Sequence, residues 1–375
     1  MRVVITGGAG FIGTHLSRRL IAEGNEVVVL DSFSPQIHGS NQDLAMDLQG
    51  HVRLVRGDVR DREALREALA AADAVVHLAA ETGTGQSMYE VARYSDVNIQ
   101  GTAILMDLLV NDRNMKVQKV VVASSRATYG EGRYQCSQHG VVFPGARCQE
   151  ALLQGQFEPE CPLCRAPCRS LPTTEDTPFS PTSFYGLSKQ VQEQMCLMFG
   201  RTLGISAYAL RYQNVFGQGQ SLQNPYTGIL AIFSGLARSG KDVRIFEDGQ
   251  ESRDFVHVLD VVEATRRALG PAVKGSFALN VGSGVATTVL QVAQEIIKYF
   301  KSKSSIQITG EFRIGDIRHN TADLTLAEKI LGYKPSISFA EGLHSFLDWA
   351  AEEQAMTGGY EQSLAELRQR GLMNG

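Results

Sequence analysis

Residues 2–13 read RVVITGGAGFIG, and this stretch decides the fold of the chain. Its first five residues are mostly apolar and rich in β-branched side chains, which is typical of a buried strand. Glycines interrupt this strand, and leucines at helical spacing then follow until Gly24. A second apolar run, residues 26–30, ends on Asp31. The sequence therefore predicts a strand, a glycine turn, a helix and a second strand that ends on a carboxylate.

This arrangement is suited to a dinucleotide. Glycines let the chain turn tightly, and they let a pyrophosphate reach the free amides and the positive dipole end of the helix N-terminus. Asp31 lies about twenty residues further on, where a carboxylate accepts hydrogen bonds from the adenosine ribose. We predict NAD rather than NADP, because Asp31 would repel a 2′-phosphate and residues 32–34 supply no cation. The predicted contacts are Gly7, Gly10, Phe11, Ile12, Gly13 and Asp31.

The length, net charge and hydrophobicity of the chain indicate its size class and exclude some classes of protein. The 375 residues can bury a large core and form two lobes. A formal net charge of −4 gives no sign of a surface that binds nucleic acid. No apolar run approaches the roughly 20 residues that span a bilayer, so we expect a cytoplasmic protein that does not enter the membrane.

Strand-like and helix-like segments alternate over the first half of the chain. Such alternation predicts an α/β fold, a Rossmann-type doubly wound parallel sheet that binds ligands beyond the carboxyl ends of its strands. We expect a Rossmann domain over residues 1–180, and over 181–357 the remainder of its core interleaved with a smaller substrate lobe. Residues 358–375 are predicted to form a weakly attached amphipathic helix and tail. Further predicted strands are 52–55, 74–78, 119–123, 206–210 and 243–246, and the predicted helices are 61–70, 96–109, 181–203, 225–238, 259–269, 290–300 and 339–351.

A serine, a tyrosine and a lysine carry the predicted chemistry. Tyr185 and Lys189 lie four residues apart on a predicted helix and therefore share one face. A phenol normally has a pKa of about 10, and a nearby ammonium favours the ionised form, which can act as a base. Ser125 follows a predicted strand, from which it could hold a substrate hydroxyl against Tyr185. An exposed helix pair is the alternative, and the preceding dinucleotide motif argues against it.

With these motifs in this order, the sequence resembles the extended short-chain dehydrogenase/reductase family, specifically its nucleotide-sugar epimerases and dehydratases. The resemblance runs from residue 1 to about residue 350, apart from residues 131–177. It implies a homodimer that pairs long helices near 96–109 and 182–203. The motifs that match are residues 6–13, 57–59, 77–80, 98–102, 124–125, 129–130, 211–217, 253–258 and 315–318, with Asp31, Tyr185 and Lys189.

The same resemblance implies roles for particular residues. A nucleotide sugar would be the substrate, with its diphosphate held between two arginines, since a guanidinium fork suits phosphate. The implied cofactor contacts are Asp58, Val59, Leu78, Ala79, Ala80, Asn98, Tyr185 and Lys189. The implied substrate contacts are Ser125, Arg126, Asn214, Arg253 and Arg318.

The residues after Ser125 separate the reactions of this family. The resemblance implies an Asp-Glu pair there in 4,6-dehydratases and a Glu in the related decarboxylases, whereas this chain has Arg126 and Ala127. We therefore expect a 4-epimerase, an isomerase of the 5.1.3 type, with tightly held NAD. It would oxidise C4, let the 4-keto sugar turn and reduce it from the other face. A nucleotide-sugar dehydrogenase or reductase, and a catalytically silent NAD-binding protein, are the alternatives.

Residues 131–177 interrupt the regular pattern and contain five of the six cysteines. In a cytosolic chain such clustering favours a metal over disulfides. Two ligand pairs, each with two residues between its members, suit a closed tetrahedral site for structural zinc. The predicted ligands are Cys136, His139, Cys161 and Cys164. Cys148 or Cys168 could replace one of them, and reduced thiols or a Cys164–Cys168 disulfide are the alternatives.

This insertion resembles one found in a group within the family, the dTDP-L-rhamnose 4-epimerases and their close relatives. The shared motifs are Cys-x-x-His-Gly at 136–140, Cys-Pro-x-Cys at 161–164 and the NPYTG of residues 224–228. The resemblance implies dTDP-L-rhamnose and dTDP-6-deoxy-L-talose as the substrate pair. UDP-glucose with UDP-galactose, and UDP-uronic acids, are alternative substrates. We expect the insertion to form a wall of the sugar pocket or a contact with a partner.

Overall fold

A seven-stranded parallel sheet forms the centre of the molecule, which is represented by a computed structural model that describes residues 1–222, 224, 228–270, 274–353 and 359–374. The strand order is β13-β9-β5-β4-β1-β2-β3, so the direction of winding reverses between β1 and β4. Ligands bind at this switch point in open α/β sheets. The predicted Rossmann-type sheet is confirmed. Its strands are β1 (Arg2–Thr6), β2 (Glu26–Asp31), β3 (Arg53–Arg56), β4 (Ala74–His77), β5 (Lys119–Ser125), β9 (Ser206–Tyr212) and β13 (Ser276–Val281).

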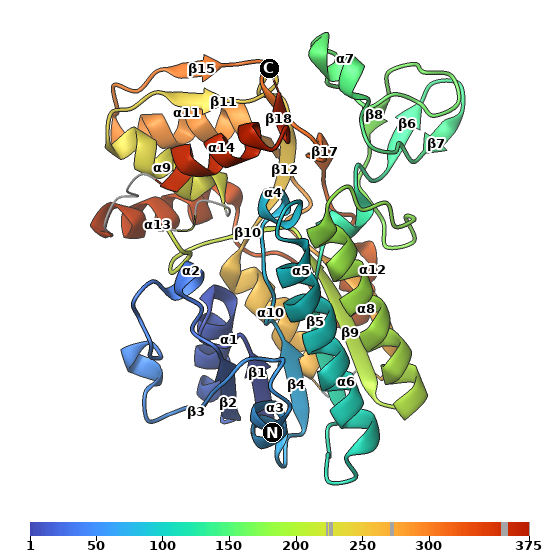
Figure 1. The fold of residues 1–375 in the computed structure, drawn as a ribbon, viewed down its shortest axis with the longest axis vertical. Helices are drawn as coiled ribbons and strands as arrows, with labels where there is room; N and C mark the ends of the chain where they lie inside the picture. Colours follow the sequence, from blue (N-terminus) through green and yellow to red (C-terminus); the bar gives the residue numbers. More distant parts are fainter. Residues whose placement is uncertain (223, 225–227, 271–273, 354–358, 375) are drawn as a thin grey trace.

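Helices cover both faces of this sheet (Figure 1). One face packs against α1 (Phe11–Ala22) and α10 (Val258–Leu269). The other face packs against α3 (Arg62–Leu69), α6 (Gly101–Asn111) and α8 (Phe184–Leu203). Because both faces are covered, the strands are apolar almost throughout, as buried parallel strands are. Across the described ranges, no helix is long and apolar enough to cross a membrane.

The predicted helix 96–109 begins earlier than its apolar period indicates. A short helix α5 (Val91–Tyr94) continues into a π-helical turn η2 (Ser95–Gln100) and then into α6. The predicted helix 225–238 is α9 (Ile229–Arg238), and its expected start at 225–227 lies outside the described residues. Short elements that the sequence pattern did not reveal are α2 (Pro35–His38), η1 (Met46–Leu48), α4 (Thr84–Ser87), η3 (Arg126–Tyr129) and α12 (Thr325–Leu331).

The substrate lobe lies above the carboxyl ends of the strands and has its own core (Figure 1). Three helices, α9, α11 (Val289–Phe300) and α13 (Phe339–Glu352), pack beside the pair β11 (Val243–Ile245) and β15 (Ile306–Ile308). A second small sheet joins the lobe to the Rossmann core. It consists of β10 (Asn214–Phe216), β12 (Ser252–His257), β14 (Ala286–Thr288) and β17 (His319–Asn320).

The cysteine-rich insertion is a separate small layer on the edge of the molecule (Figure 1). Three strands, β6 (Tyr134–Cys136), β7 (Gly140–Val142) and β8 (Arg169–Ser170), form a sheet, and α7 (Gln149–Leu153) follows β7. Its core contains Tyr134, Val142 and three buried cysteines. An insertion with so few apolar residues needs another source of stability.

The C-terminal helix is present as predicted, but the expected weak attachment is wrong. Helix α14 (Gly359–Gln369) is followed by β18 (Met373–Asn374), which pairs antiparallel with β16 (Phe312–Arg313). Leu364 and Leu367 on α14 are buried. The described residues 359–374 are therefore packed against the substrate lobe.

Candidate active site

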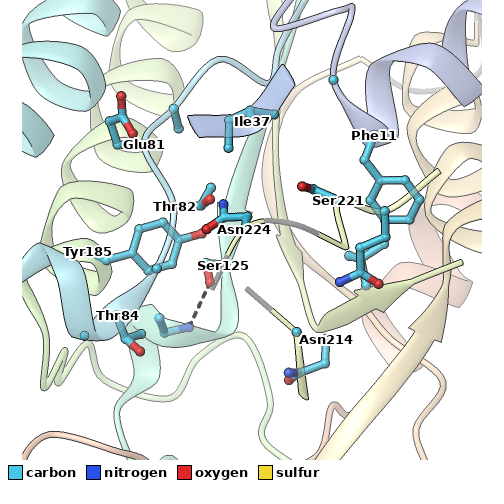
Figure 2. A pocket seen from close by; sticks show the side chains of 18 of the residues that line it. Phe11, Ile37, Glu81, Thr82, Thr84, Ser125, Tyr185, Asn214, Ser221 and Asn224 are labelled. Atoms are coloured by element: carbon cyan, nitrogen blue, oxygen red, sulfur yellow. Dashed lines mark hydrogen bonds between the residues drawn. The ribbon is translucent and has the colours of Figure 1, made fainter. Parts of the chain in front are cut away.

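One large cavity, of about 560 Å³, opens at the carboxyl ends of the strands, between the Rossmann core and the substrate lobe. Figure 2 shows Tyr185 and Ser125 reaching into it from one side, and Phe11 and Asn214 from the other. None of the described residues in 131–177 lines this cavity, so the insertion does not form a wall of the pocket. The predicted site residues that do line it are Gly7, Gly10, Phe11, Ile12, Gly13, Asp31, Asp58, Val59, Leu78, Ala79, Ala80, Ser125, Arg126, Tyr185, Asn214 and Arg253.

The glycine turn forms the anion-binding end of the predicted cofactor site. Helix α1 starts after Gly10, and no described side chain caps it, so its first amides face the cavity unpaired. Gly7 has a φ of +68°, and a Cβ there would lie 2.9 Å from the Ala79 backbone. A Cβ on Gly13 would lie 2.5 Å from the Gly8 Cα. These positions accept glycine alone, and the open amides beside them fit a pyrophosphate.

Asp31 is held in place for the ribose of such a cofactor. Its Oδ2 accepts from the Ala9 amide at 3.0 Å, and its Oδ1 accepts from the Phe33 amide at 2.9 Å. Around it the cavity is lined by Ser32, Ser34, Ile37 and His38, and this described stretch offers no lysine or arginine. His38 Nε2 lies 3.4 Å from Asp31 Oδ1. A fixed carboxylate with no lysine or arginine in this stretch fits NAD better than NADP.

The predicted catalytic residues Ser125 and Tyr185 lie where β5 ends and α8 begins. Ser125 is the last residue of β5, and its Oγ accepts a 3.1 Å hydrogen bond from the Ala127 amide (Figure 2). Ser183 caps α8 by accepting from the Gly186 amide, which sets the first turn that carries Tyr185. Burial raises the pKa of Tyr185, while its hydrogen bond with Ser125 and the charge of Arg126 act in the opposite direction.

Lys189 stands behind Tyr185 rather than in the cavity wall. Its Nζ lies 6.0 Å from the centre of the Tyr185 ring and donates to the Ala123 carbonyl at 2.9 Å. Burial lowers the pKa of Lys189 to about 7. Because this pKa is close to neutral pH, the charge of Lys189 can respond to the ionisation of Tyr185.

The structure places Asn98 outside the cavity lining, although the sequence predicts it as a cofactor ligand. Its Oδ1 accepts from the Glu81 amide at 2.7 Å, and its Nδ2 donates to the Glu81 carbonyl and to the Ser188 hydroxyl. The side chain is fully buried and its polar atoms are satisfied. Asn98 therefore joins the π-helical turn to the loop after β4 and to α8.

A cationic cluster forms the opposite end of the cavity. Arg253 on β12 donates to Asp316 at 3.2 Å, and Arg313 pairs with the same carboxylate at 2.9 Å. Burial raises the pKa of Asp316, but the charges of Arg313 and Arg253 hold it below the usual value. Burial and the neighbouring Arg253 lower the pKa of Arg126 to about 9. Arg126 Nη1 and Arg313 Nε are buried and have no hydrogen-bond partner among the described residues. Buried donors normally have a partner, so these two are suited to bind an anion.

Arg318 lies outside this cluster, although the sequence predicts it as a diphosphate ligand. It is 1% exposed and does not line the cavity. Its guanidinium donates to Glu158, Glu247 and Asp248 at 2.7–2.9 Å. Arg318 thereby joins the insertion to the substrate lobe. Two cavity-lining arginines were not predicted from the sequence, Arg244 and Arg313, and Arg313 lies at the other end of the same Arg-Ile-Gly-Asp-Ile-Arg run.

The four predicted metal ligands come together in the insertion. Their ligand atoms all lie within 4.8 Å of one another. Cys136 Sγ is 3.6 Å from His139 Nδ1 and 3.7 Å from Cys164 Sγ, and Cys161 Sγ is 3.5 Å from His139 Nδ1. Bond lengths of about 2.3 Å for Zn–S and 2.0–2.1 Å for Zn–N place tetrahedral ligand atoms about 3.5–3.8 Å apart. The donor set therefore fits zinc.

Neither of the spare cysteines belongs to this quartet. Cys148 is exposed and its Sγ donates to Glu150 at 2.7 Å. Cys168 is buried in the same small core, outside the four-ligand cluster. All six cysteines are free thiols, so the alternative Cys164–Cys168 disulfide is not formed.

Comparison with known proteins places this fold and site among nucleotide-sugar enzymes. The profile of the NAD dependent epimerase/dehydratase family matches residues 3–143 and 164–282. The dTDP-L-rhamnose 4-epimerase of Burkholderia thailandensis is 38% identical over 356 residues, which cover 94% of this chain and 95% of that protein.

Solved structures show the same relationship. MoeE5, in complex with UDP-glucuronic acid and NAD, has a TM-score of 0.75 and 29% identity over 94% of this chain and 99% of its own. UDP-glucose 4-epimerase of Thermotoga maritima, with UDP-glucose, has a TM-score of 0.75 and 28% identity over the same shares of the two chains, 94% and 99%.

The chain therefore belongs to the NAD dependent epimerase/dehydratase family. The predicted family and the predicted class, an enzyme of the nucleotide-sugar epimerase type, are confirmed.

Proposed function

We propose that this protein is an NAD-dependent nucleotide-sugar 4-epimerase and that its physiological substrate pair is dTDP-L-rhamnose and dTDP-6-deoxy-L-talose. The observation that carries the proposal is the set of side chains around Tyr185. Ser125 and Lys189 flank it, and Arg126 occupies the position from which a dehydratase would act with an acid. Reversible oxidation at one carbon is the chemistry that these groups support.

The residues of this chain have separable tasks in such a reaction. Ser125 and Tyr185 would hold the C4 hydroxyl between them, and Tyr185 would take its proton and later return it. Lys189 would favour the ionised phenol from behind. NAD bound along the glycine turn would supply reversible hydride transfer. Arg126, Arg253 and Arg313 would hold the diphosphate while the sugar turns.

The choice of substrate has two sources of support. The relative at 38% identity acts on dTDP-L-rhamnose, and this chain also carries the insertion that resembles that group. Solved relatives with UDP-glucose and UDP-glucuronic acid favour UDP-sugars as the alternative. One experiment separates the two: purified protein is incubated without added cofactor with either dTDP-L-rhamnose or UDP-glucose, and the sugar protons are followed by NMR.

We expect a C4 epimer from dTDP-L-rhamnose and a much slower conversion of UDP-glucose. Efficient epimerisation of UDP-glucose alone would replace the proposed substrate by the alternative one. Accumulation of NADH at 340 nm with a keto product would instead indicate a dehydrogenase. NAD-containing protein that converts neither sugar would contradict the proposed substrates.

We also propose that the insertion holds one structural zinc ion on Cys136, His139, Cys161 and Cys164. The match between their separations and tetrahedral zinc geometry supports this. Mass spectrometry of purified protein should find about one zinc per chain, as one four-ligand site requires. The double variant Cys161→Ser/Cys164→Ser should lose it and melt at lower temperature, because the insertion has little core of its own. Cys148→Ser, in the same insertion, should retain the metal; folded wild-type protein without zinc would refute the site.

A homodimer is the remaining proposal. Helices α6 and α8 pack side by side on one edge of the molecule, and Val110, Leu187 and Met198 on them are exposed (Figure 1). Pairing these helices with those of a second copy would cover this apolar surface. Light scattering should give a dimer for the wild type and a monomer for Met198→Glu. Met46→Glu, at an exposed methionine on η1, should not change the mass.

A further inference from the structure

Part of the last sixteen described residues, 359–374, lines the active-site cavity. Tyr360, Ser363, Leu364 and Leu367 on α14 contribute to the lining of the same cavity as Tyr185. These four residues occupy positions i, i+3, i+4 and i+7, so they lie on one face of the helix. Ser363, Leu364 and Leu367 on that face are buried and Tyr360 is partly buried, whereas Glu361, Gln362 and Ala365 on the other face are exposed. We call residues 359–374 the C-terminal segment.

This segment connects the two halves of the molecule across the cavity. Leu364, Leu367 and Met373 form a small apolar cluster with Tyr89 from the Rossmann side and Phe246 from the substrate lobe. Leu367 comes so near the loop after β4 that a Cβ on Gly85 would lie 3.4 Å from its side chain. Figure 1 shows α14 and β18 beside β11 of the lobe and near α4 of the Rossmann half.

Polar contacts add to this attachment on both sides. The Tyr89 hydroxyl donates to Glu366 at 2.9 Å, and the Arg370 guanidinium lies 4.2 Å from the Tyr89 ring centre. On the lobe, Arg368 pairs with Glu311 at 2.8 Å. These contacts bring residues from three distant parts of the sequence together at one end of the cavity.

The same segment adjoins the cationic cluster. Strand β18 pairs with β16, and in that pairing Met373 is opposite Arg313. The Ile314 amide donates to the Leu372 carbonyl at 3.0 Å. Arg313 and Asp316 line a second small cavity together with Leu367 and Leu372. The backbone that carries Arg313 is therefore held on one side by the C-terminal segment.

We propose that the C-terminal segment is part of the substrate-binding site: it closes the end of the cavity that receives the nucleoside diphosphate, and it positions Arg313 for the phosphates. This inference rests on the proposed nucleotide-sugar substrate. Tyr360 and Leu364 are the residues of α14 that would face the bound nucleotide, and Met373 acts through β16 as a positioning residue.

A binding experiment tests this without the need for turnover. Affinities for dTDP and for UDP are measured by calorimetry on full-length protein and on a protein truncated after Glu353. We expect the truncation to weaken the binding of the favoured nucleotide at least tenfold, because the cavity loses a wall and Arg313 loses its strand partner. Bound NAD and the melting temperature of the Rossmann core are measured on both proteins, and both should be retained.

Truncation also removes contacts that the C-terminal segment makes with the substrate lobe. A matched pair of point variants separates this effect from the loss of the cavity wall. Leu364→Asp places a carboxylate on the cavity face of α14, and Ala365→Asp places one on its exposed face. Leu364→Asp should weaken dTDP binding at least tenfold, and Ala365→Asp should change it less than twofold. In wild-type protein, added dTDP should slow hydrogen exchange at residues 359–374.

The outcomes separate this inference from the proposed function. Truncated protein that binds nucleotide within twofold of the full-length protein would overturn the role of the C-terminal segment and leave the epimerase standing. Unchanged hydrogen exchange at 359–374 in the presence of saturating dTDP would do the same. Full-length protein that holds NAD but binds neither dTDP nor UDP would instead overturn the substrate class itself.

Discussion

The two ends of the cavity differ in how the chain constructs them. At the catalytic end, Tyr185 and Lys189 come from one turn of α8, and Ser125 comes from the adjacent strand β5. At the diphosphate end, Arg126, Arg253 and Arg313 come from three separate segments and meet around Asp316. The first arrangement depends on local spacing, and the second depends on how distant segments pack.

The two ends of the cavity also differ in their electrostatics. Burial holds Tyr185 and Lys189 toward their neutral forms, since it raises the pKa of one and lowers that of the other. The arginines at the far end retain an excess of positive charge over Asp316. The difference suggests that the catalytic end is specialised for moving a proton and the diphosphate end for holding an anion.

The largest expected effect tests the catalytic end. Tyr185→Phe should reduce kcat by about 10³-fold, since it removes the group that exchanges the C4 proton. NAD content and dTDP affinity should be unchanged, because the diphosphate end is intact. Tyr299→Phe, at a half-buried tyrosine of the substrate lobe that does not line the cavity, is the matched control and should turn over normally. Epimerisation followed by NMR is the measurement; near-normal activity of Tyr185→Phe would rule out this mechanism.

The next effect tests the diphosphate end with two arginines of the same run. Arg313→Met should weaken dTDP binding about 10-fold or more, as the loss of a hydrogen bond to a charged group does. Arg318→Met should leave dTDP affinity within threefold but lower the free energy of unfolding by about 1–3 kcal/mol, since it removes the charged hydrogen bonds to Glu158, Glu247 and Asp248. Calorimetry and urea denaturation give the two readouts. If Arg318→Met lost nucleotide binding and kept its stability, Arg318 would be a nucleotide ligand despite its place outside the cavity.

A smaller expected effect concerns the free energy of unfolding that is lost by burying the Lys189 amine. Burial lowers the pKa of Lys189 to about 7, so the protonated form is disfavoured in the folded protein relative to the unfolded chain. This penalty is present in full below pH 7 and fades as the pH rises toward the ordinary lysine pKa of about 10.4. Lys189→Met should therefore raise the free energy of unfolding, on the order of a few kcal/mol at pH 6 and less at pH 9. A gain that increased with pH, in urea titrations at both pH values, would contradict this.

The smallest effect concerns Asn98. Asn98→Ala should lower the free energy of unfolding by about 1–3 kcal/mol, because the Glu81 amide loses its buried acceptor. NAD affinity should change less than threefold, since the side chain is outside the cavity. Fluorescence titration of NAD into cofactor-free protein measures this. A loss of NAD affinity without a loss of stability would restore the role that sequence reasoning assigned.

Where the signal was local, sequence reasoning grouped residues that the structure also brings together. The glycine turn and Asp31, the Tyr-x-x-x-Lys spacing and the two ligand pairs of the insertion all lie within short stretches. In the structure these residues line one cavity, support it from behind or form one cluster. The early start of the helix before α6 escaped notice because a π-helical turn breaks the 3.6-residue period.

By itself, then, the sequence determined the fold class and the family, and it predicted the catalytic trio, because periodicity and fixed spacing place those groups whatever surrounds them. Only the tertiary structure shows that Arg313 lines the cavity and Arg318 does not, since a long charged side chain goes where packing offers either a cavity or a group of carboxylates. It also decided the place of the last helix. The amphipathic period of α14 predicts that one face of this helix packs against the protein. Only the tertiary structure shows that this face lines the active-site cavity.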